Sequence, residues 1–340
     1  MDPIKFSVIG FGRIGKRHAK IIHEFEHSSL LSVTDVNSDQ FSAIDELGIE
    51  GHAYHSLRDF IAKDNNASDV VSICTPNGFH TEYAVKLLNA GYHVVIEKPM
   101  GLSKESCLDV IGAQEATGNR VFVVKQNRYS PPSEWMKKVV TEGLIGDVLM
   151  VQVNCYWNRD ERYYKDSSWR GTNDLDGGAL FTQFSHFVDL MYWVFGDIKA
   201  PEAMVKNFTH PKLVDFDDSG FAQFEFVNGG IGSINYSTSC WDKNMESSIT
   251  VIGSRGSFKV GGQYMNEVEY CHIQDYEMPE LPQTNPPNDY GPFKGSAANH
   301  HYVIENIVET LNGKSEPTAN AFEGMKVVSI IEQIYNAAKK

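Results

Sequence analysis

The chain has 340 residues, of which 41% are hydrophobic and 22% charged, a globular composition with enough apolar material for two cores. Its 44 acidic and 30 basic residues give a net charge of -14, which disfavours binding to nucleic acid or an acidic membrane surface. Five widely spaced cysteines indicate neither a disulfide framework nor a metal site. No apolar run approaches the ~20 residues of a membrane span and no export signal is evident, so a cytoplasmic protein is expected.

Residues 5–124 alternate short β-branched runs with amphipathic segments of helix length, a pattern typical of a parallel sheet with crossover helices. One such helix is expected from His80 to Ala90, closed by Gly91. The predicted strands are Phe6–Ile9, Leu30–Thr34, Val70–Cys74, Val94–Ile96 and Val121–Val123. We therefore expect residues 1–124 to form a doubly wound α/β domain of the Rossmann type.

From residue 125 to 340 the predicted strands follow one another through short turns, which indicates an α+β domain with an open, mostly antiparallel sheet. The strand candidates are Val148–Trp157, Phe221–Phe226, Gly230–Ser237, Ile249–Ile252 and Ser257–Val260. Helices are expected at Ser133–Gly143, Ala179–Phe195, His301–Leu311 and Phe322–Ala338. Residues 277–296 contain five of the 13 prolines and are expected to form an irregular loop, either functional or disordered.

A GxGxxG motif, Gly10-Phe11-Gly12-Arg13-Ile14-Gly15, follows the first predicted strand and opens the first predicted helix. In this context Gly10 permits the tight turn, Gly12 lets a pyrophosphate approach the backbone, and Gly15 lets helix and strand pack closely. The free N–H groups of the helix N-terminus then hold the anion. Asp35, at the end of the second strand, suits the ribose 2′-hydroxyl and repels a 2′-phosphate, so the sequence favours NAD over NADP.

Further motifs follow the third and fourth predicted strands: Thr75-Pro76-Asn77 with His80, and Glu97-Lys98-Pro99. Ligands of open parallel sheets bind at the carboxyl ends of the strands, which is where Lys98 is expected. Together with the glycine motif, these residues resemble the Gfo/Idh/MocA family of oxidoreductases, and the resemblance spans nearly the whole chain. It implies that the residues of these motifs, together with Gln126, bind the cofactor, and that Lys98 meets the substrate beside the nicotinamide.

The same resemblance assigns a role to a histidine of the second domain, in the segment from Gly177 to Asp189. A histidine on an apolar helix is ordinarily a core residue, but the preceding glycine pair and its position match the family's substrate histidine, here His186. Many members carry an aspartate four residues earlier, where this chain has Thr182. With Gln183 beside it, the expected site uses amide and hydroxyl groups rather than a carboxylate–histidine pair.

Within the family, several segments look like the UDP-N-acetylglucosaminuronate 3-dehydrogenases of bacterial surface-polysaccharide synthesis. They are residues 125–129, 157–164, 168–172, 287–291 and 295–300. This resemblance implies a substrate site composed of Lys98, Tyr129, Arg159, Arg162, Tyr163, Arg170, Thr182, Gln183, His186, Tyr290, Asn299 and His300.

The residue types agree with an anionic nucleotide-sugar. Arg159, Arg162 and Arg170 are suited to a diphosphate and a sugar carboxylate, and tyrosines can stack on sugar or uracil. The alternative is that these arginines pair at the surface with acidic neighbours, namely Asp160, Glu161, Asp166 or Asp174.

The expected reaction is NAD-dependent oxidation of a secondary alcohol, by resemblance the C3 hydroxyl of UDP-N-acetylglucosaminuronate. Lys98 stabilises the developing alkoxide, and either His186 or Lys98 takes the proton. A 2-oxo acid that reoxidises the cofactor is a further expectation taken from relatives. Two alternatives stay open: a dehydrogenase of a free sugar, inositol or glycoside, and a regulator that senses NAD and a sugar without chemistry.

An open antiparallel sheet also needs cover for an apolar outer face, for which we expect Phe224, Phe226, Ile234 and Val251. Relatives pair such faces between subunits, so a homodimer or homotetramer is expected.

Overall fold

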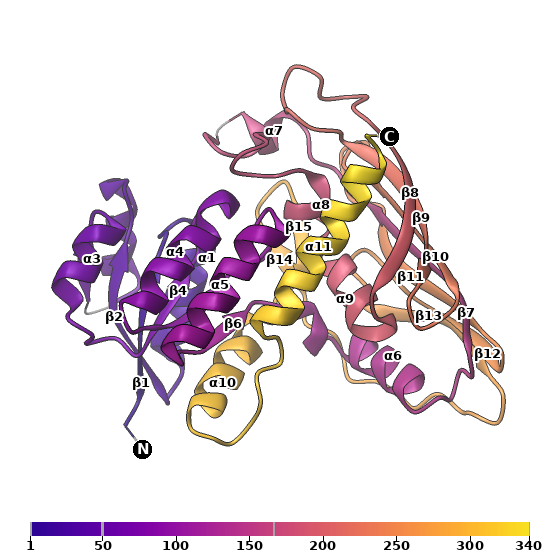
Figure 1. Ribbon diagram of the computed structural model, residues 1–340, viewed down its shortest axis with the longest axis horizontal. Helices are drawn as coiled ribbons and strands as arrows, with labels where there is room; N and C mark the ends of the chain where they lie inside the picture. Colours follow the sequence, from indigo (N-terminus) through magenta and orange to yellow (C-terminus); the bar gives the residue numbers. More distant parts are fainter. Residues whose placement is uncertain (1, 49–50, 166, 340) are drawn as a thin grey trace. The chain divides into compact units, whose positions relative to one another are not determined.

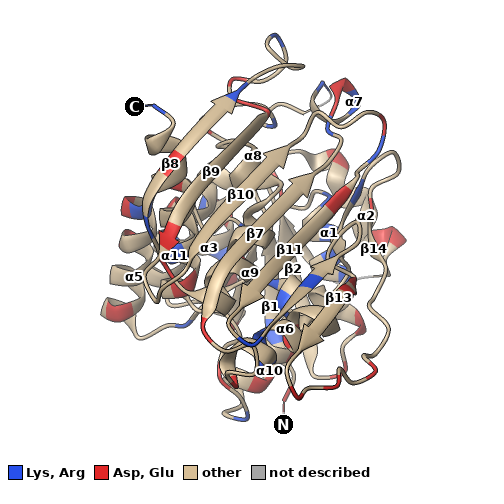
Figure 2. Cartoon of the chain, turned by 90° about the vertical axis from the view of Figure 1, so that its right-hand side faces the viewer, with Lys and Arg blue, Asp and Glu red and all other residues tan. Residues whose placement is uncertain are grey.

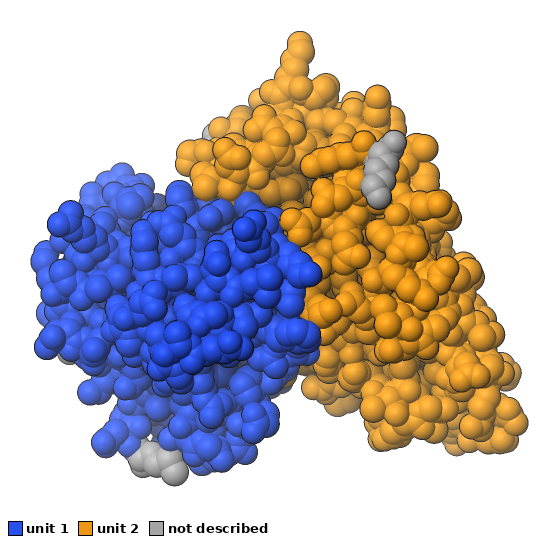
Figure 3. All heavy atoms as spheres, viewed as in Figure 1, with its two compact units in different colours: residues 1–125, 300–325 blue, residues 126–299, 326–340 orange. Residues whose placement is uncertain are grey.

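The computed structural model describes residues 2–48, 51–165 and 167–339 of the chain. It separates into two compact units, the first comprising residues 1–125 and 300–325, the second 126–299 and 326–340 (Figure 3). The first boundary lies one residue from the expected one. Residues 300–325, however, belong to the first unit, whereas the sequence suggested a continuous second domain.

The first unit contains a parallel sheet of six strands in the order β3-β2-β1-β4-β5-β6 (Figure 1). The strands are β1 (Ile4–Ile9), β2 (Ser28–Thr34), β3 (His52–Tyr54), β4 (Val70–Ile73), β5 (His93–Ile96) and β6 (Val121–Val123). The five predicted strands are confirmed. The edge strand β3 was missed because its three residues are polar or partly exposed and supply no buried apolar run.

Helices flank this sheet and connect its strands. They are α1 (Arg13–Glu24), α2 (Ser42–Glu46), α3 (Leu57–Asp64), α4 (His80–Asn89), α5 (Lys104–Thr117) and α10 (His300–Leu311). Helix α10 packs against α1, and α4 packs against α5. After α10 the chain reaches the edge strand β6, where the Val123 N–H donates to the Ala319 carbonyl at 3.1 Å. These contacts attach residues 300–325 to the first unit.

The second unit contains a seven-stranded sheet in the order β13-β12-β11-β7-β10-β9-β8. The strands are β7 (Val148–Tyr156), β8 (Ile198–Lys206), β9 (Ser219–Phe226), β10 (Ile231–Ser237), β11 (Glu246–Gly253), β12 (Gly256–Gly261) and β13 (Glu267–Ile273). All neighbours are antiparallel except β7 and β10, which run parallel. The α+β prediction is confirmed, although β8 and β13, each with only one buried residue, were not predicted.

The two faces of this sheet differ from the sequence prediction. Phe224, Phe226, Ile234 and Val251 are all buried and face the core, so the prediction that they form the outer face was wrong by one residue of register. The exposed face instead carries the alternate residues of the same strands, and Figure 2 shows charged positions along several of them, including β8, β9 and β11. We define this outer face by its exposed apolar residues Met150, Met204, Phe221, Ile231, Ile252 and Tyr270.

Helices cover the inner face of the sheet (Figure 1). They are α6 (Pro131–Thr141), α8 (Ala179–Thr182), α9 (Ser185–Phe195) and residues 326–337 of α11 (Ala321–Ala337). The short helix α7 (Glu161–Tyr164) lies in the connection from β7 to α8, and the 3-10 turn η3 (Gln126–Tyr129) precedes α6. The single helix expected at 179–195 is two helices, because the chain breaks at Gln183 and Phe184. The proline-rich loop includes a small hairpin, β14 (Pro287–Asp289) and β15 (Lys294–Ala297).

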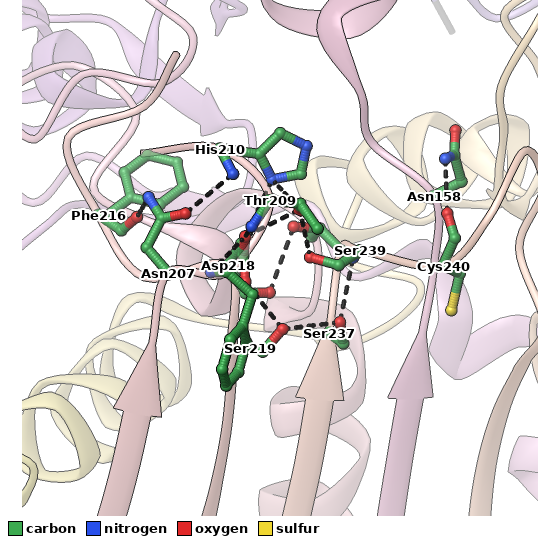
Figure 4. A network of polar contacts seen from close by, with 12 residues as sticks. Asn158, Asn207, Thr209, His210, Phe216, Asp218, Ser219, Ser237, Ser239 and Cys240 are labelled. Carbon is green, nitrogen blue, oxygen red and sulfur yellow. Dashed lines mark hydrogen bonds and ion pairs between the residues drawn. The ribbon is translucent and has the colours of Figure 1, made fainter. Parts of the chain in front are cut away.

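A polar network holds the loop between β8 and β9 (Figure 4). The buried Asp218 carboxylate accepts hydrogen bonds from the backbone of Phe208 and Thr209, from the Thr209 hydroxyl and from the Ser219 hydroxyl, at 2.8 to 3.1 Å. His210 Nδ1 lies 3.1 Å from the same carboxylate.

Over the described residues, no helix is both long and apolar enough to cross a bilayer.

Candidate functional site

The glycine motif forms the turn between β1 and α1, and each glycine has its own structural reason. Gly10 has φ +88°, and a Cβ there would lie 2.6 Å from the Cys74 carbonyl carbon. A Cβ on Gly15 would lie 1.9 Å from the Gly10 oxygen. Gly12 is the N-cap of α1 with no side-chain cap, and a Cβ there would meet nothing within 4 Å. The first turn of α1 therefore presents uncapped N–H groups to open space, which fits a pyrophosphate.

Asp35 follows β2 and lies beside this turn. One carboxylate oxygen accepts the Phe11 N–H at 2.6 Å, and the other accepts the Asn37 N–H at 2.9 Å. These two bonds fix the carboxylate next to the motif, as recognition of an adenosine ribose requires.

Lys98 lies at the carboxyl end of β5, between Glu97 and Pro99, and histidine side chains contact both of these neighbours. The Glu97 carboxylate accepts a hydrogen bond from His18 Nε2 at 3.0 Å, and His300 Nε2 lies 3.5 Å from the same oxygen. Its second oxygen accepts the backbone N–H of Lys98 at 3.0 Å. On the other side, the His80 ring lies 2.7 Å from the Pro99 carbonyl oxygen. The backbone around Lys98 is thus held at both neighbours.

The electrostatics of Glu97 follow from these contacts. Burial favours the neutral acid, but the hydrogen bonds and charges of His18 and His300 outweigh it and hold the pKa of Glu97 well below its usual range. Burial lowers the pKa of His300, with Glu97 opposing. Glu97 is therefore a buried carboxylate anion next to Lys98.

The Thr75-Pro76-Asn77 segment follows β4, the strand beside β5. The Thr75 carbonyl lies 2.8 Å from His80 Nε2, so the imidazole of His80 bridges the ends of these two strands. Burial lowers the pKa of His80, although both carbonyl contacts oppose the shift. The Thr75 hydroxyl is buried without a hydrogen-bond partner, and Asn77 is buried beside it in the chain.

In the second unit, Arg159 follows β7 and only 2% of its surface is exposed. Its Nε donates to Gln183 Oε1 at 2.7 Å, and its Nη groups donate to the Asn158 carbonyl, to Asn244 and to the Lys294 carbonyl. The guanidinium carbon lies 4.8 to 5.4 Å from the ring centres of Trp157, Tyr163 and Phe293. Among the described residues no carboxylate lies within ion-pair distance of Arg159, and burial lowers its pKa.

A second cation lies on the same tyrosine. The guanidinium carbon of Arg170 is 4.4 Å from the Tyr163 ring centre. The Nε atom of Arg170 is buried without a hydrogen-bond partner in the described part of the chain. Gln183 joins this cluster by donating to the Tyr163 hydroxyl at 2.8 Å. Two guanidinium groups without a carboxylate partner, gathered around one aromatic ring, form a place suited to an anion.

Arg162 is placed differently. It is exposed and forms a bidentate pair with Asp160, with Asp242 at 3.6 Å. The alternative of a surface ion pair therefore describes Arg162, and we leave it out of the site. Asp166, another partner considered for the arginines, lies outside the described residues.

His186 is buried in the first turn of α9, three residues after Gln183. Thr182 hydrogen-bonds the buried carboxylate of Asp176, which also accepts the Gly171 N–H at 2.7 Å. A carboxylate is thus present in this region, but it belongs to Asp176 and contacts α8 through the hydroxyl of Thr182.

The remaining predicted residues lie on η3 and the hairpin loop, which contact each other. Burial lowers the pKa of Arg159, and an electrostatic interaction with Tyr290 is among the contacts that oppose this shift. Asn299 donates to the Gln126 carbonyl and the Ser130 hydroxyl at 3.3 and 3.1 Å, a structural role that sequence did not indicate. The side-chain oxygen of Gln126 is buried without a partner, and Tyr129 is half-buried.

Residues 4–125 match the oxidoreductase family with an NAD-binding Rossmann fold, and residues 134–259 match the GFO/IDH/MocA C-terminal domain. The chain belongs to the Gfo/Idh/MocA family of oxidoreductases and has the NAD-binding Rossmann domain of that family. The predicted fold, cofactor and enzyme class are thereby confirmed.

Three proteins that are similar to this chain are relevant to the choice of substrate. The WlbA dehydrogenase from Bordetella pertussis, solved with NADH and UDP-GlcNAcA, is 30% identical with a TM-score of 0.88, over 99% of this chain and 97% of that chain. The 2,7-anhydro-N-acetylneuraminate hydratase of Escherichia coli K12 is 25% identical over 76% of this chain and 68% of its own length. The glucose-6-phosphate 3-dehydrogenase of Bacillus subtilis is 24% identical over 97% of this chain and 95% of its own length.

The cluster residues that sequence reasoning did not assign to the site include His18 and Asp176. His18 lies one helical turn past Gly15 on the face of α1 that is buried, so helical spacing could have indicated it. Nothing in the local pattern around Asp176 marked it as a partner of Thr182.

Proposed function

We propose that this protein oxidises the C3 hydroxyl of UDP-N-acetylglucosaminuronate or a closely related anionic nucleotide-sugar. The observation that carries the proposal is the buried Arg159, whose described hydrogen-bond partners are all neutral. Arg159 and Arg170 both contact the ring of Tyr163. A buried cation costs free energy unless an anion compensates it, and a substrate carboxylate or phosphate supplies that anion. The named ligand of the WlbA relative carries both groups.

The proposed reaction uses bound NAD, Lys98 and His186. Bound NAD supplies the acceptor for the hydride that leaves the sugar carbon. Lys98 donates a hydrogen bond to the reacting oxygen and stabilises the charge that develops there as the hydroxyl proton departs. His186 accepts that proton directly or shares the task with Lys98, so alcohol and NAD+ become ketone, NADH and one proton.

The test is NADH formation, followed by absorbance, with UDP-N-acetylglucosaminuronate, UDP-N-acetylglucosamine, glucose 6-phosphate and inositol. We expect turnover of the first substrate and a kcat/KM at least about tenfold lower for UDP-N-acetylglucosamine, which lacks the carboxylate. Preference for glucose 6-phosphate or inositol contradicts the nucleotide-sugar assignment. Absence of turnover with every substrate, despite NADH binding, favours the sensor. Adding a 2-oxo acid shows whether bound NADH is reoxidised.

Variants locate the anion site. Arg170→Ala is expected to lower kcat/KM on the UDP-sugar about 10- to 100-fold, because it removes a charged hydrogen-bond donor. Arg162→Ala is the matched control, since Arg162 is already paired with Asp160, and it is expected to change kcat/KM less than about twofold. Equal effects of the two substitutions contradict the proposed site.

A further inference from the structure

Three histidines from three different helices converge on the short segment that carries Lys98. His18 comes from α1 and His300 from α10, and both ring Nε2 atoms face one oxygen of Glu97, at 3.0 and 3.5 Å. His80, at the start of α4, faces the Pro99 carbonyl. All of these residues lie in the first unit, and Glu97, His18 and His300 are each at most 5% exposed.

The hydrogen-bond roles within this group are determined by chemistry. A carboxylate anion only accepts hydrogen bonds, so His18 must carry its proton on Nε2, which leaves Nδ1 free to accept from the Ser72 hydroxyl at 3.4 Å. The other Glu97 oxygen accepts the backbone N–H of Lys98. The carboxylate thus connects two helices to the peptide group of Lys98.

We propose that His18 and His300 are positioning residues which act through Glu97 to fix Lys98 at the end of β5. The inference rests on the role of Lys98 in the proposed function. Proton and hydride transfer depend steeply on the placement of the group that binds the reacting oxygen, so a Glu97 that has lost its histidine donors leaves Lys98 misplaced without removing it.

The side chains of His18, Glu97 and His300 are also of the types that bind zinc, and their ligand atoms lie within 4.8 Å of one another. No fourth histidine, cysteine or carboxylate among the described residues joins them. A nitrogen that donates its proton to Glu97 cannot bind a metal at the same time, so the two arrangements exclude each other. Metal binding is therefore an outcome that overturns the proposal.

The first experiment is independent of the substrate. Hydrogen exchange of the peptide containing the Lys98 amide is compared by mass spectrometry in the wild-type protein and in His18→Leu and His300→Leu. We expect exchange about tenfold faster in both variants, because Glu97 is no longer held as the acceptor of that amide. His23→Leu on α1 and His301→Leu on α10 are matched controls at exposed positions, and we expect them to exchange as the wild-type protein does.

The second experiment separates positioning from folding. With the UDP-sugar, His18→Leu is expected to lower kcat about 10- to 100-fold, while KM and the Kd of NADH stay within about twofold. His18→Gln restores an N–H close to the position of Nε2 and is expected to recover most of the lost kcat. Equal loss of NADH affinity and kcat, or a Gln variant as impaired as Leu, indicates a structural role and overturns the proposal.

Metal analysis completes the test. We expect less than about 0.1 zinc per chain after dialysis against zinc, and no effect of a chelator on kcat. Stoichiometric zinc that His18→Leu abolishes overturns the proposal in favour of a metal site. If the wild-type protein turns over none of the sugars, the proposed function fails, while the exchange experiment still decides whether the histidines hold the Lys98 amide.

Discussion

At the scale of single residues, buried charges in this protein are compensated in three different ways. Arg128 forms a bidentate pair with Asp189, with both side chains almost completely buried. Asp218 has five donors around its carboxylate and one imidazole among them. Arg159 has only neutral oxygens and aromatic rings. This difference is why Arg159, and not Arg128, indicates a binding site.

Asp218 makes the acid stability of the second unit testable. Burial raises its pKa, but the hydrogen bonds from His210, Thr209, Ser219 and Phe208 outweigh burial and depress it. A depressed folded-state pKa contributes stability that is complete above the unfolded value, about 3.9, and is lost as the pH falls below it. We expect Asp218→Asn to lower the free energy of unfolding by about 1–3 kcal/mol at pH 7.

The measurement is urea denaturation followed by fluorescence between pH 3 and 8. The deficit of Asp218→Asn relative to the wild-type protein is expected to shrink as the pH falls below about 4. Asp217→Asn is the neighbouring control, expected to shift stability by less than about 0.5 kcal/mol. A deficit that is the same at every pH contradicts the electrostatic explanation.

At the scale of elements, the turn from β1 to α1 separates two kinds of glycine. Gly15 has no room for a Cβ because that atom would collide with the Gly10 carbonyl oxygen, whereas a Cβ on Gly12 would meet nothing within 4 Å. The first is needed by the fold, and the second is needed only when a ligand lies against the helix.

This distinction predicts different outcomes for two alanine substitutions. Gly12→Ala is expected to keep the wild-type melting temperature within about 2 °C but to weaken NADH binding at least about tenfold. Gly15→Ala is expected to lower both, because the turn itself must shift. Gly112→Ala, on the exposed face of α5 with nothing within 4 Å, is the control and is expected to stabilise by about 0.5–1 kcal/mol. Calorimetry and NADH titration check all three, and a Gly12→Ala protein that binds NADH normally contradicts the placement of the pyrophosphate.

The elements that sequence predicted well are those with strong local patterns. Strands buried on both faces, such as β1 and β4, have continuous apolar runs, and GxGxxG has a spacing that only one turn explains. The misses lack such signals: β8 has only one buried residue, and the break before α9 lies inside a continuous run of buried residues. The Glu97 group joins residues 18, 97 and 300, and no local pattern contains that information.

At the scale of the whole molecule, the outer face of the seven-stranded sheet carries six exposed apolar side chains beside its polar ones. Its residues adjoin across the ladder, where Met150 pairs with both Ile231 and Ile252, and Met204 pairs with Phe221. Phe221 is 52% exposed. Exposed apolar groups of this kind favour burial against a second copy.

We therefore expect a homodimer or homotetramer held by this face. Phe221→Glu is expected to reduce the molar mass measured by light scattering after gel filtration, since a buried charge opposes association. Leu108→Glu, at an exposed apolar position of α5 in the first unit, is the control and should leave the mass unchanged. A wild-type protein that is monomeric at micromolar concentration contradicts this prediction.

The discontinuous first unit also has a consequence for biosynthesis. Residues 1–125 leave the ribosome before the whole of 126–299, yet their compact unit is finished only when 300–325 have been made. Until then α1 lacks the helix that packs on it, and the carboxylate at 97 lacks one of its imidazole neighbours. In a nascent chain, residues 1–125 therefore stay incompletely folded while residues 126–299 are translated. A chain that stops near residue 299 can complete neither the first unit nor the hydrogen bonds around Glu97.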